Sequence, residues 1–175
     1  TLEELSIADL GGATLTGVGR LTAQGGGLDL KLDAQRLGDL AALIRRVAPG
    51  AASDALVARA SALSPAKATM GVATNAAGAF TQLNLESEAG GARYSAQLQP
   101  TGDGRVKAQL VANAPDASVL LRQFGFLVLP LRGLGAARVE AVGEGAWGGA
   151  LSTRARVELP GASMTFNGET TASAD

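Results

Sequence analysis

Hydrophobic and polar residues alternate strictly in the segment "LDLKLD" at residues 28–33. Leucines occupy every second position, and charged residues fill the positions between them. A period of two is typical of a β-strand with one buried face. The Thr-rich segment before it ends in three glycines at 25–27, which predicts a hairpin of two strands. Residues 2–7 predict one further strand.

The spacing changes to that of a helix from Asp39 onward. The apolar residues at helical spacing are Leu40, Leu43, Ile44 and Val47. We expect Asp39 to cap this short amphipathic helix and Pro49-Gly50 to end it.

Two more helices are predicted. Residues 53–63 form an amphipathic pattern that Ser64-Pro65 ends. The inward residues in this pattern are Leu56, Val57, Ala60 and Leu63. Another helix is predicted from Asp116 to about Gly125, and its inward residues are Val119, Leu120 and Phe124.

Period two returns after each helical region. The segments "KATMGVATN", "FTQLNLESE", "ARYSAQLQ" and "RVKAQLVAN" lie between residues 67 and 113, and glycine-containing turns separate them. Three more alternating segments, "AARVEAVGEGA", "LSTRARVEL" and "ASMTFNGET", lie between residues 136 and 170. We therefore predict an α+β domain with a mainly antiparallel sheet and about three short amphipathic helices packed on one face.

The order of elements occurs twice. The helical segment "DLAALIRR" at 39–46 aligns with "DASVLLRQ" at 116–123. The strand openings "GATLTG", "GARYSA" and "GASMTF", at Gly12, Gly91 and Gly161, are also alike. We interpret residues 1–175 as a single domain of two weak strand–helix–strand repeats, at about 12–100 and 101–172.

The second block, "VANAPDASVLLRQFGFLVLPLRGLGAARVEAVGEGAWGGALSTRARVELPGASMTFNGE", and the shorter "LDLKLDAQRLGDLAALIRR" resemble the AsmA family of bacterial envelope proteins, with its AsmA- and TamB-like repeats. Members of that family repeat a strand, a short helix opening near Asp-Leu-x-x-Leu, a Pro-containing link, and antiparallel strands starting near Gly-Ala. The resemblance covers about half of the chain.

This resemblance implies a curved, repeat-built sheet in the periplasm and a role in outer-membrane biogenesis. The larger members of the family move phospholipid along such a sheet. The chain starts at Thr1, and its longest apolar run, at 124–131, is far shorter than a bilayer span. These two observations suggest a fragment of a longer protein, and the resemblance implies that an inner-membrane helix anchors that protein.

Composition narrows the possible chemistry. The chain has neither Cys nor His, so thiolate sites, disulfides, serine triads and the common zinc sites are excluded. Its 15 basic and 16 acidic residues are scattered, which argues against nucleic-acid binding. We expect no enzymatic activity, no metal and no cofactor.

The strands share an apolar parity, which predicts a sheet with one aliphatic face. One interpretation is that the helices leave part of this face uncovered as an apolar groove for phospholipid acyl chains. The candidate residues are Leu28, Leu30, Leu32, Leu83, Leu85, Tyr94, Leu98, Val106, Leu110, Val157, Leu159, Met164 and Phe166. The alternative is a sealed core under the helices.

Other signals point to less specific roles. Exposed sheet edges could add a strand from a neighbouring repeat or an envelope protein, which is the alternative function. Glu86 and Glu88 share the polar parity of one strand, and we interpret them as a solvated face. The glycine pairs "GVG" at Gly17 and "GEG" at Gly143 are expected to be bends or bulges rather than a nucleotide fingerprint.

Overall fold

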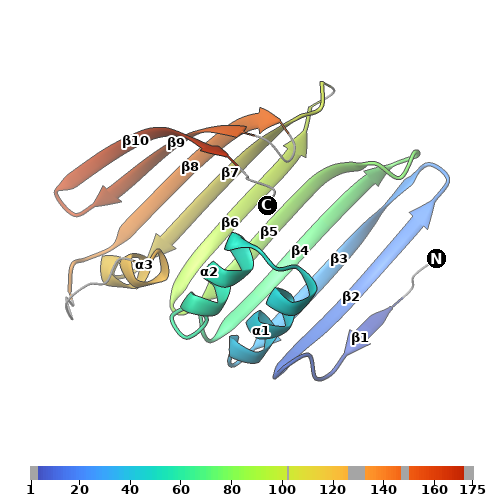
Figure 1. Cartoon of the computed structure of the whole chain (residues 1–175), viewed down its shortest axis with the longest axis horizontal. Helices are drawn as coiled ribbons and strands as arrows, with labels where there is room; N and C mark the ends of the chain where they lie inside the picture. The colour runs from blue at the N-terminus through green and yellow to red at the C-terminus, as the bar shows by residue number, and fades with distance from the viewer. Residues whose placement is uncertain (1–3, 102, 126–132, 147–149, 172–175) are drawn as a thin grey trace.

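A computed structural model describes residues 4–101, 103–125, 133–146 and 150–171. In this part of the chain a ten-stranded antiparallel sheet follows the order of the sequence, from β1 to β10 (Figure 1). The strands are β1 (Leu5–Ile7), β2 (Ala13–Thr22), β3 (Gly25–Ala34), β4 (Ala66–Asn75), β5 (Phe80–Ala89), β6 (Ala92–Pro100), β7 (Arg105–Ala114), β8 (Ala137–Ala146), β9 (Ala150–Leu159) and β10 (Ala162–Thr171). The predicted antiparallel α+β class is confirmed.

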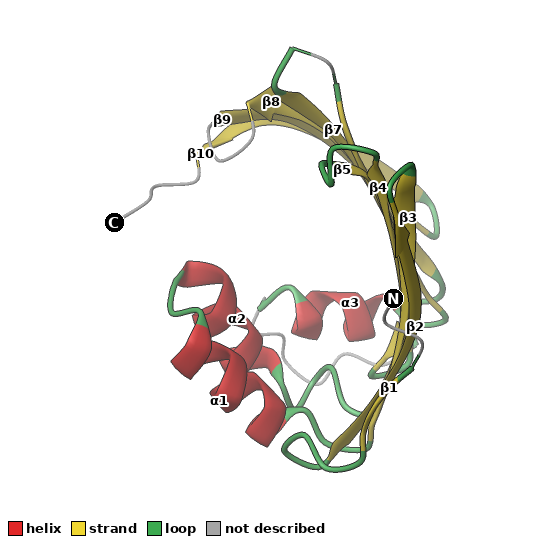
Figure 2. Cartoon of the chain, turned by 90° about the vertical axis from the view of Figure 1, so that its right-hand side faces the viewer, coloured by secondary structure: helices red, strands yellow, loops and turns green. Residues whose placement is uncertain are grey.

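The helices are inserted between strands at one end of the sheet. Helices α1 (Gly38–Val47) and α2 (Ala51–Arg59) connect β3 to β4, and α3 (Ala117–Gln123) lies between β7 and β8. Figure 2 shows that the sheet is curved and that all three helices lie on its concave side. The aligned segments 39–46 and 116–123 therefore correspond to α1 and to α3 with its N-cap. The division of the single domain into two repeats, at about 12–100 and 101–172, stays a prediction.

A row of alanines runs across the sheet beneath the helices. Directly opposed residues on adjacent strands lie on the same face of the sheet. In the register, the alanines of neighbouring strands lie opposite one another and so form one row. The buried members are Ala13, Ala34, Ala66, Ala89, Ala92, Ala114 and Ala137. Methyl side chains let the helices approach the sheet closely, so the tightest packing lies along this row.

Two clusters make up the core over this row. The first joins the alanines of β2 to β5 to Leu37, Leu40, Ala41 and Ala60 of the α1–α2 region. The second joins the alanines of β6 to β8 to Ala117 and Leu120 of α3. Tyr94 on β6 packs against both clusters. The core is therefore a narrow band at one end of the strands.

Glycine conformation explains the recurrent Gly-Ala openings. Gly12, Gly91 and Gly161 have φ values of 78°, 87° and 77°, in the left-handed region that favours glycine. Each is followed directly by the first residue of a strand, Ala13, Ala92 or Ala162. The motif thus combines a turn residue with a member of the alanine row.

The prediction that Asp39 caps α1 is wrong. The helix begins at Gly38, so Asp39 already lies in the first turn, where its carboxylate interacts favourably with the helix dipole. The N-cap is Leu37, whose backbone N–H donates to Ser64 Oγ at 3.0 Å. The third helix was predicted to start at Asp116, and Asp116 is the N-cap of α3, where its carboxylate accepts from Ser118 N at 2.9 Å.

Several other details differ from expectation. Helix α2 ends at Arg59, four residues before the predicted end at Leu63, although Leu63 still packs against the first cluster. Phe124 is the C-cap of α3 and is 39% exposed, because the α3 residues buried against the sheet are those one turn earlier.

The Gly17 and Gly143 regions are not bulges. Strand β2 pairs with β3, and β8 pairs with β7, in continuous register through these glycines.

The apolar stripe of α1 is only partly buried. Leu40 is buried in the first cluster, whereas Leu43 and Ile44 are exposed by 36% and 38% and Val47 by 78%. The helix therefore contacts the core with its N-terminal half only.

The convex face of the sheet carries interleaved charges. Lys67 lies between Asp33 and Glu88 in the register, and its Nζ is 3.2 Å from Asp33 Oδ2. Arg105 and Glu144 form a similar pair at 3.4 Å on β7 and β8. These exposed pairs contribute little stability, but they keep this face hydrated.

The alanine row supplies a test of the packing. Ala92 is 0% exposed, so Ala92→Leu forces extra methylenes under α3 and is expected to lower the free energy of unfolding by about 1–3 kcal/mol. Ala162 lies at the end of the same row but is exposed. Ala162→Leu is therefore expected to change the free energy of unfolding by less than about 0.5 kcal/mol. Urea unfolding followed by circular dichroism measures both, and equal effects would contradict the assigned packing.

Candidate functional site

The register places the candidate residues on the concave face, in successive rows across the strands. Beyond the alanine row, the next row includes Leu32, Tyr94, Val157 and Met164. Two further rows follow, and we call them the open rows. The first contains Leu30, Met70, Leu85, Ala96, Leu110, Ala141, Ala155 and Phe166, and the second contains Leu28, Val72, Leu83, Leu98 and Ala108.

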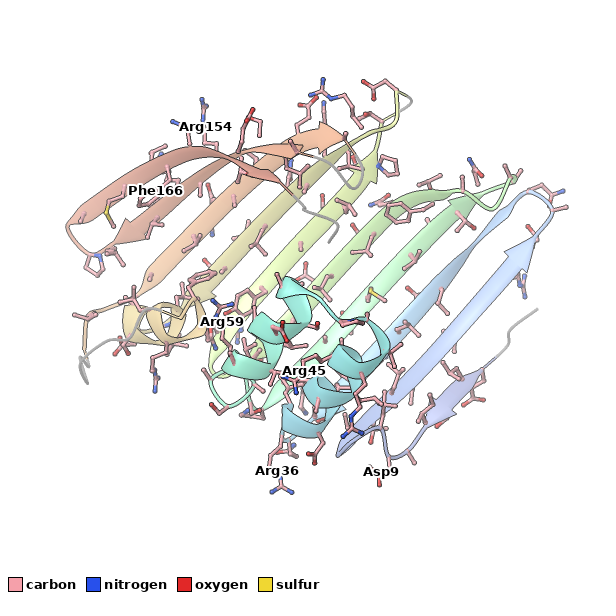
Figure 3. All side chains as sticks on the ribbon, in the orientation of Figure 1. Asp9, Arg36, Arg45, Arg59, Arg154 and Phe166 are labelled. Atoms are coloured by element: carbon pink, nitrogen blue, oxygen red, sulfur yellow. The ribbon has the colours of Figure 1, made fainter. Side chains whose placement is uncertain are left out.

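The open rows lie outside both core clusters. Their residues on β3 to β9 are partly exposed, and Phe166 on β10 is 53% exposed. Figure 3 shows Phe166 on β10, far from α1 and α2. Among the described residues, no large side chain has less than 2% of its surface exposed. The part of the chain that the structure describes therefore leaves an apolar surface on the concave face.

Some candidate residues have a structural role instead. Leu32 and Leu159 pack against the core clusters under the helices, and Val106 is only 4% exposed. These three side chains offer little free surface to a ligand. Val157 and Met164 lie in the row between the alanine row and the open rows. Met164 is 46% exposed because β10 is the last strand.

Tyr94 is held by a residue that the sequence pattern did not identify. The Tyr94 hydroxyl donates a short hydrogen bond to Gln123 Oε1 at the end of α3. Gln123 is 4% exposed, and its Nε2 donates to Ala89 O at 2.8 Å and to Ala62 O at 3.0 Å. One amide thus connects α3 with β5, β6 and the segment after α2.

A second contact joins the same helices. The Arg59 guanidinium at the end of α2 donates to Phe124 O at 3.2 Å, at the C-terminus of α3 (Figure 3). A cation is favourable there because the helix dipole places negative charge on the last carbonyls. Burial raises the pKa of the Tyr94 phenol further above neutral pH, where this hydroxyl is protonated in any case and can donate.

The chemistry of the open rows is simple. Every position named in them is aliphatic, thioether or aromatic, so they can bind a ligand through apolar contact and offer no acid, base or nucleophile. Glu86 and Glu88 lie on the opposite, convex face, beside Lys67, Ser95 and Arg93. The described residues contain no group of three or more acidic side chains arranged to hold a metal ion.

No helix in the described segments is long and apolar enough to span a bilayer.

Comparison of the chain with protein-family models, with curated proteins and with solved structures found no match in any of the three.

The Gln123 contacts generate a stability test. Gln123→Leu keeps the volume but leaves two carbonyls and the Tyr94 hydroxyl without a partner, and we expect it to lower the free energy of unfolding by about 3 kcal/mol. Tyr94→Phe removes one hydroxyl only and is expected to cost about 1 kcal/mol. Urea titration measures both. If Gln123→Leu were no more harmful than Tyr94→Phe, the amide would not join the elements as described.

Proposed function

We propose that the chain is a non-enzymatic periplasmic domain of an AsmA-like protein that acts in outer-membrane biogenesis by holding phospholipid acyl chains against the open rows. The observation that carries the proposal is the partial exposure of these rows on the concave side of the sheet. The sequence resemblance adds the compartment, the membrane anchor of the full-length protein, and the class of ligand.

The dimensions of the face suit an acyl chain. Neighbouring strands are about 4.8 Å apart, so a row crossing β3 to β10 is about 34 Å long. An acyl chain in one leaflet spans about 15 Å, half of the hydrocarbon thickness of a bilayer. The open rows can therefore accommodate a chain along their length.

Energetics favour a lipid with two chains. Each fully buried methylene contributes about 0.8 kcal/mol, so a chain of about fifteen methylenes with half of its surface covered gains about 6 kcal/mol. Association costs about 4–15 kcal/mol in lost freedom. Two chains, at about 12 kcal/mol, can exceed that cost, whereas one chain is held weakly. Diacyl phospholipid is thus the expected ligand.

Lipid retention tests the proposal. Protein purified without detergent is expected to release phospholipid on organic extraction, as detected by mass spectrometry. Leu83→Asp places a charge in an open row and is expected to reduce the retained lipid at least about tenfold, because an ion is costly to desolvate. Asn84→Asp introduces the same side chain on the convex face of the same strand and is expected to retain lipid.

Thermal melting separates lipid loss from unfolding. Leu83 lies outside both core clusters, so Leu83→Asp is expected to shift the melting temperature by only a few degrees. A wild-type extract without phospholipid, or a Leu83→Asp protein that no longer folds, would favour the sealed core instead.

A second candidate function is supported by the last strand. Within the described segments, β10 pairs with β9 only, and the β10 side chains from Ala162 to Glu169 are all exposed. An edge of this length can accept a strand from a neighbouring repeat or an envelope protein. In that case the chain is a structural or protein-interaction module within an extended sheet.

Hydrogen exchange tests the edge. If β10 accepts strands, its backbone amides are expected to become protected as the protein concentration rises, because another copy is the available partner. Thr165→Lys on β10 is expected to suppress this protection by charge repulsion, whereas Gln109→Lys on the central strand β7 is not. Exchange that is independent of concentration in all three proteins would argue against strand addition.

A further inference from the structure

We propose that the tip of the helix pair, defined as residues 43–50 at the end of α1 and in the turn to α2, docks on the surface of an anionic phospholipid bilayer. This inference concerns a surface separate from the open rows, and it does not require lipid to occupy them.

The exposure of the tip is the first argument. Every residue from Leu43 to Gly50 is exposed, in contrast to Leu40 and Ala41 one turn earlier, which are buried. Leu43, Ile44 and Val47 are large aliphatic side chains at helical spacing, and Val47 is 78% exposed. A single exposed valine is ordinary, but a helical stripe that leaves the core halfway along its length is a contiguous apolar surface.

The position of the tip is the second argument. Figure 2 shows the turn between α1 and α2 at the end of the helix pair that points away from the sheet. The core contacts of α1 come from Leu37, Leu40 and Ala41, near its other end. A broad surface can therefore reach the tip while the helix pair stays packed on the sheet.

The charge of the tip identifies the partner. Arg45 and Arg46 flank the apolar residues in the last turn of α1, and the segment 43–50 contains no acidic residue. Asp54 on α2 lies 3.9 Å from Arg45, and both side chains are more than half exposed, so the pair leaves the guanidinium accessible.

Aliphatic side chains between arginines match the interface of a membrane. Leucine, isoleucine and valine can enter the boundary between headgroups and acyl chains, while guanidinium groups remain at the phosphates. Each arginine near an anionic surface strengthens binding about fivefold. The three aliphatic residues supply a modest apolar area, so the docking is weak and reversible.

Vesicle flotation tests the docking. Wild-type protein is expected to float with vesicles of phosphatidylethanolamine and phosphatidylglycerol, to bind phosphatidylcholine vesicles much less, and to lose binding as salt is raised. Val47→Asp is expected to weaken binding at least about tenfold, by removing apolar burial and adding a repelled charge. The double variant Arg45→Gln/Arg46→Gln is expected to weaken it about 20-fold.

Matched controls lie on the convex face. Val142→Asp makes the same change at a 48% exposed valine that faces Arg154 and Gln109, and Arg20→Gln/Lys107→Gln removes two cations from exposed strand positions. Both are expected to bind vesicles within about twofold of wild type. Circular dichroism checks that every variant is folded.

The outcomes are distinguishable. Absence of wild-type flotation, equal binding to neutral vesicles, or tip variants that bind as well as the convex-face controls would overturn the docking. Vesicle binding by a protein whose organic extract contains no phospholipid would support the docking while counting against the proposed function.

Discussion

The length of the strands relative to the helices is the constraint on which the rest of the structure depends. Strands of ten residues extend about 33 Å, whereas a helix of about ten residues is about 15 Å long and about 10 Å wide. Three such helices can cover one end of a ten-stranded sheet but not its whole concave side. Alternation gives every long strand an aliphatic face, so apolar surface remains beyond the helices. The candidate site is thus a consequence of the dimensions of the elements rather than of any special residue.

The helices stay at their end of the sheet because small and polar residues hold them there. The alanine row allows close approach, and larger side chains at those positions would lift the helices away. Gln123 fixes the position of α3 relative to the sheet, because its amide hydrogen-bonds to two carbonyls and a phenol from different elements. Apolar packing alone is non-directional and could let the helices move over the aliphatic face. The amide therefore favours a single arrangement in which the open rows stay uncovered by the helices.

Much of the fold could be predicted from the sequence, because a period of two and a change to helical spacing are strong signals in segments such as 28–33 and 39–47. The candidate residues also lie on one face of the sheet, because alternate side chains of a strand point to opposite faces. The alanine row was missed because alanine is only weakly apolar and its alignment depends on cross-strand register. Gln123 was missed because a polar residue on a short helix indicates solvent unless its neighbours are known. The exposure of the second half of the α1 stripe could not be predicted, because periodicity gives the direction of a side chain but not the extent of the surface opposite it.

The two apolar surfaces of the molecule, the open rows and the tip, differ in shape. The open rows lie on the inside of a curved sheet, so a flexible chain can follow them, whereas a flat bilayer touches a concave surface only at its rim. The tip is convex and flanked by cations, so it suits a bilayer surface but cannot enclose an acyl chain. Shape therefore matches the proposed single lipid to the sheet face and the proposed membrane surface to the tip. If both assignments hold, docking through residues 43–50 would keep the chain beside a source of lipid while the open rows, which belong to different elements, remain free to receive it.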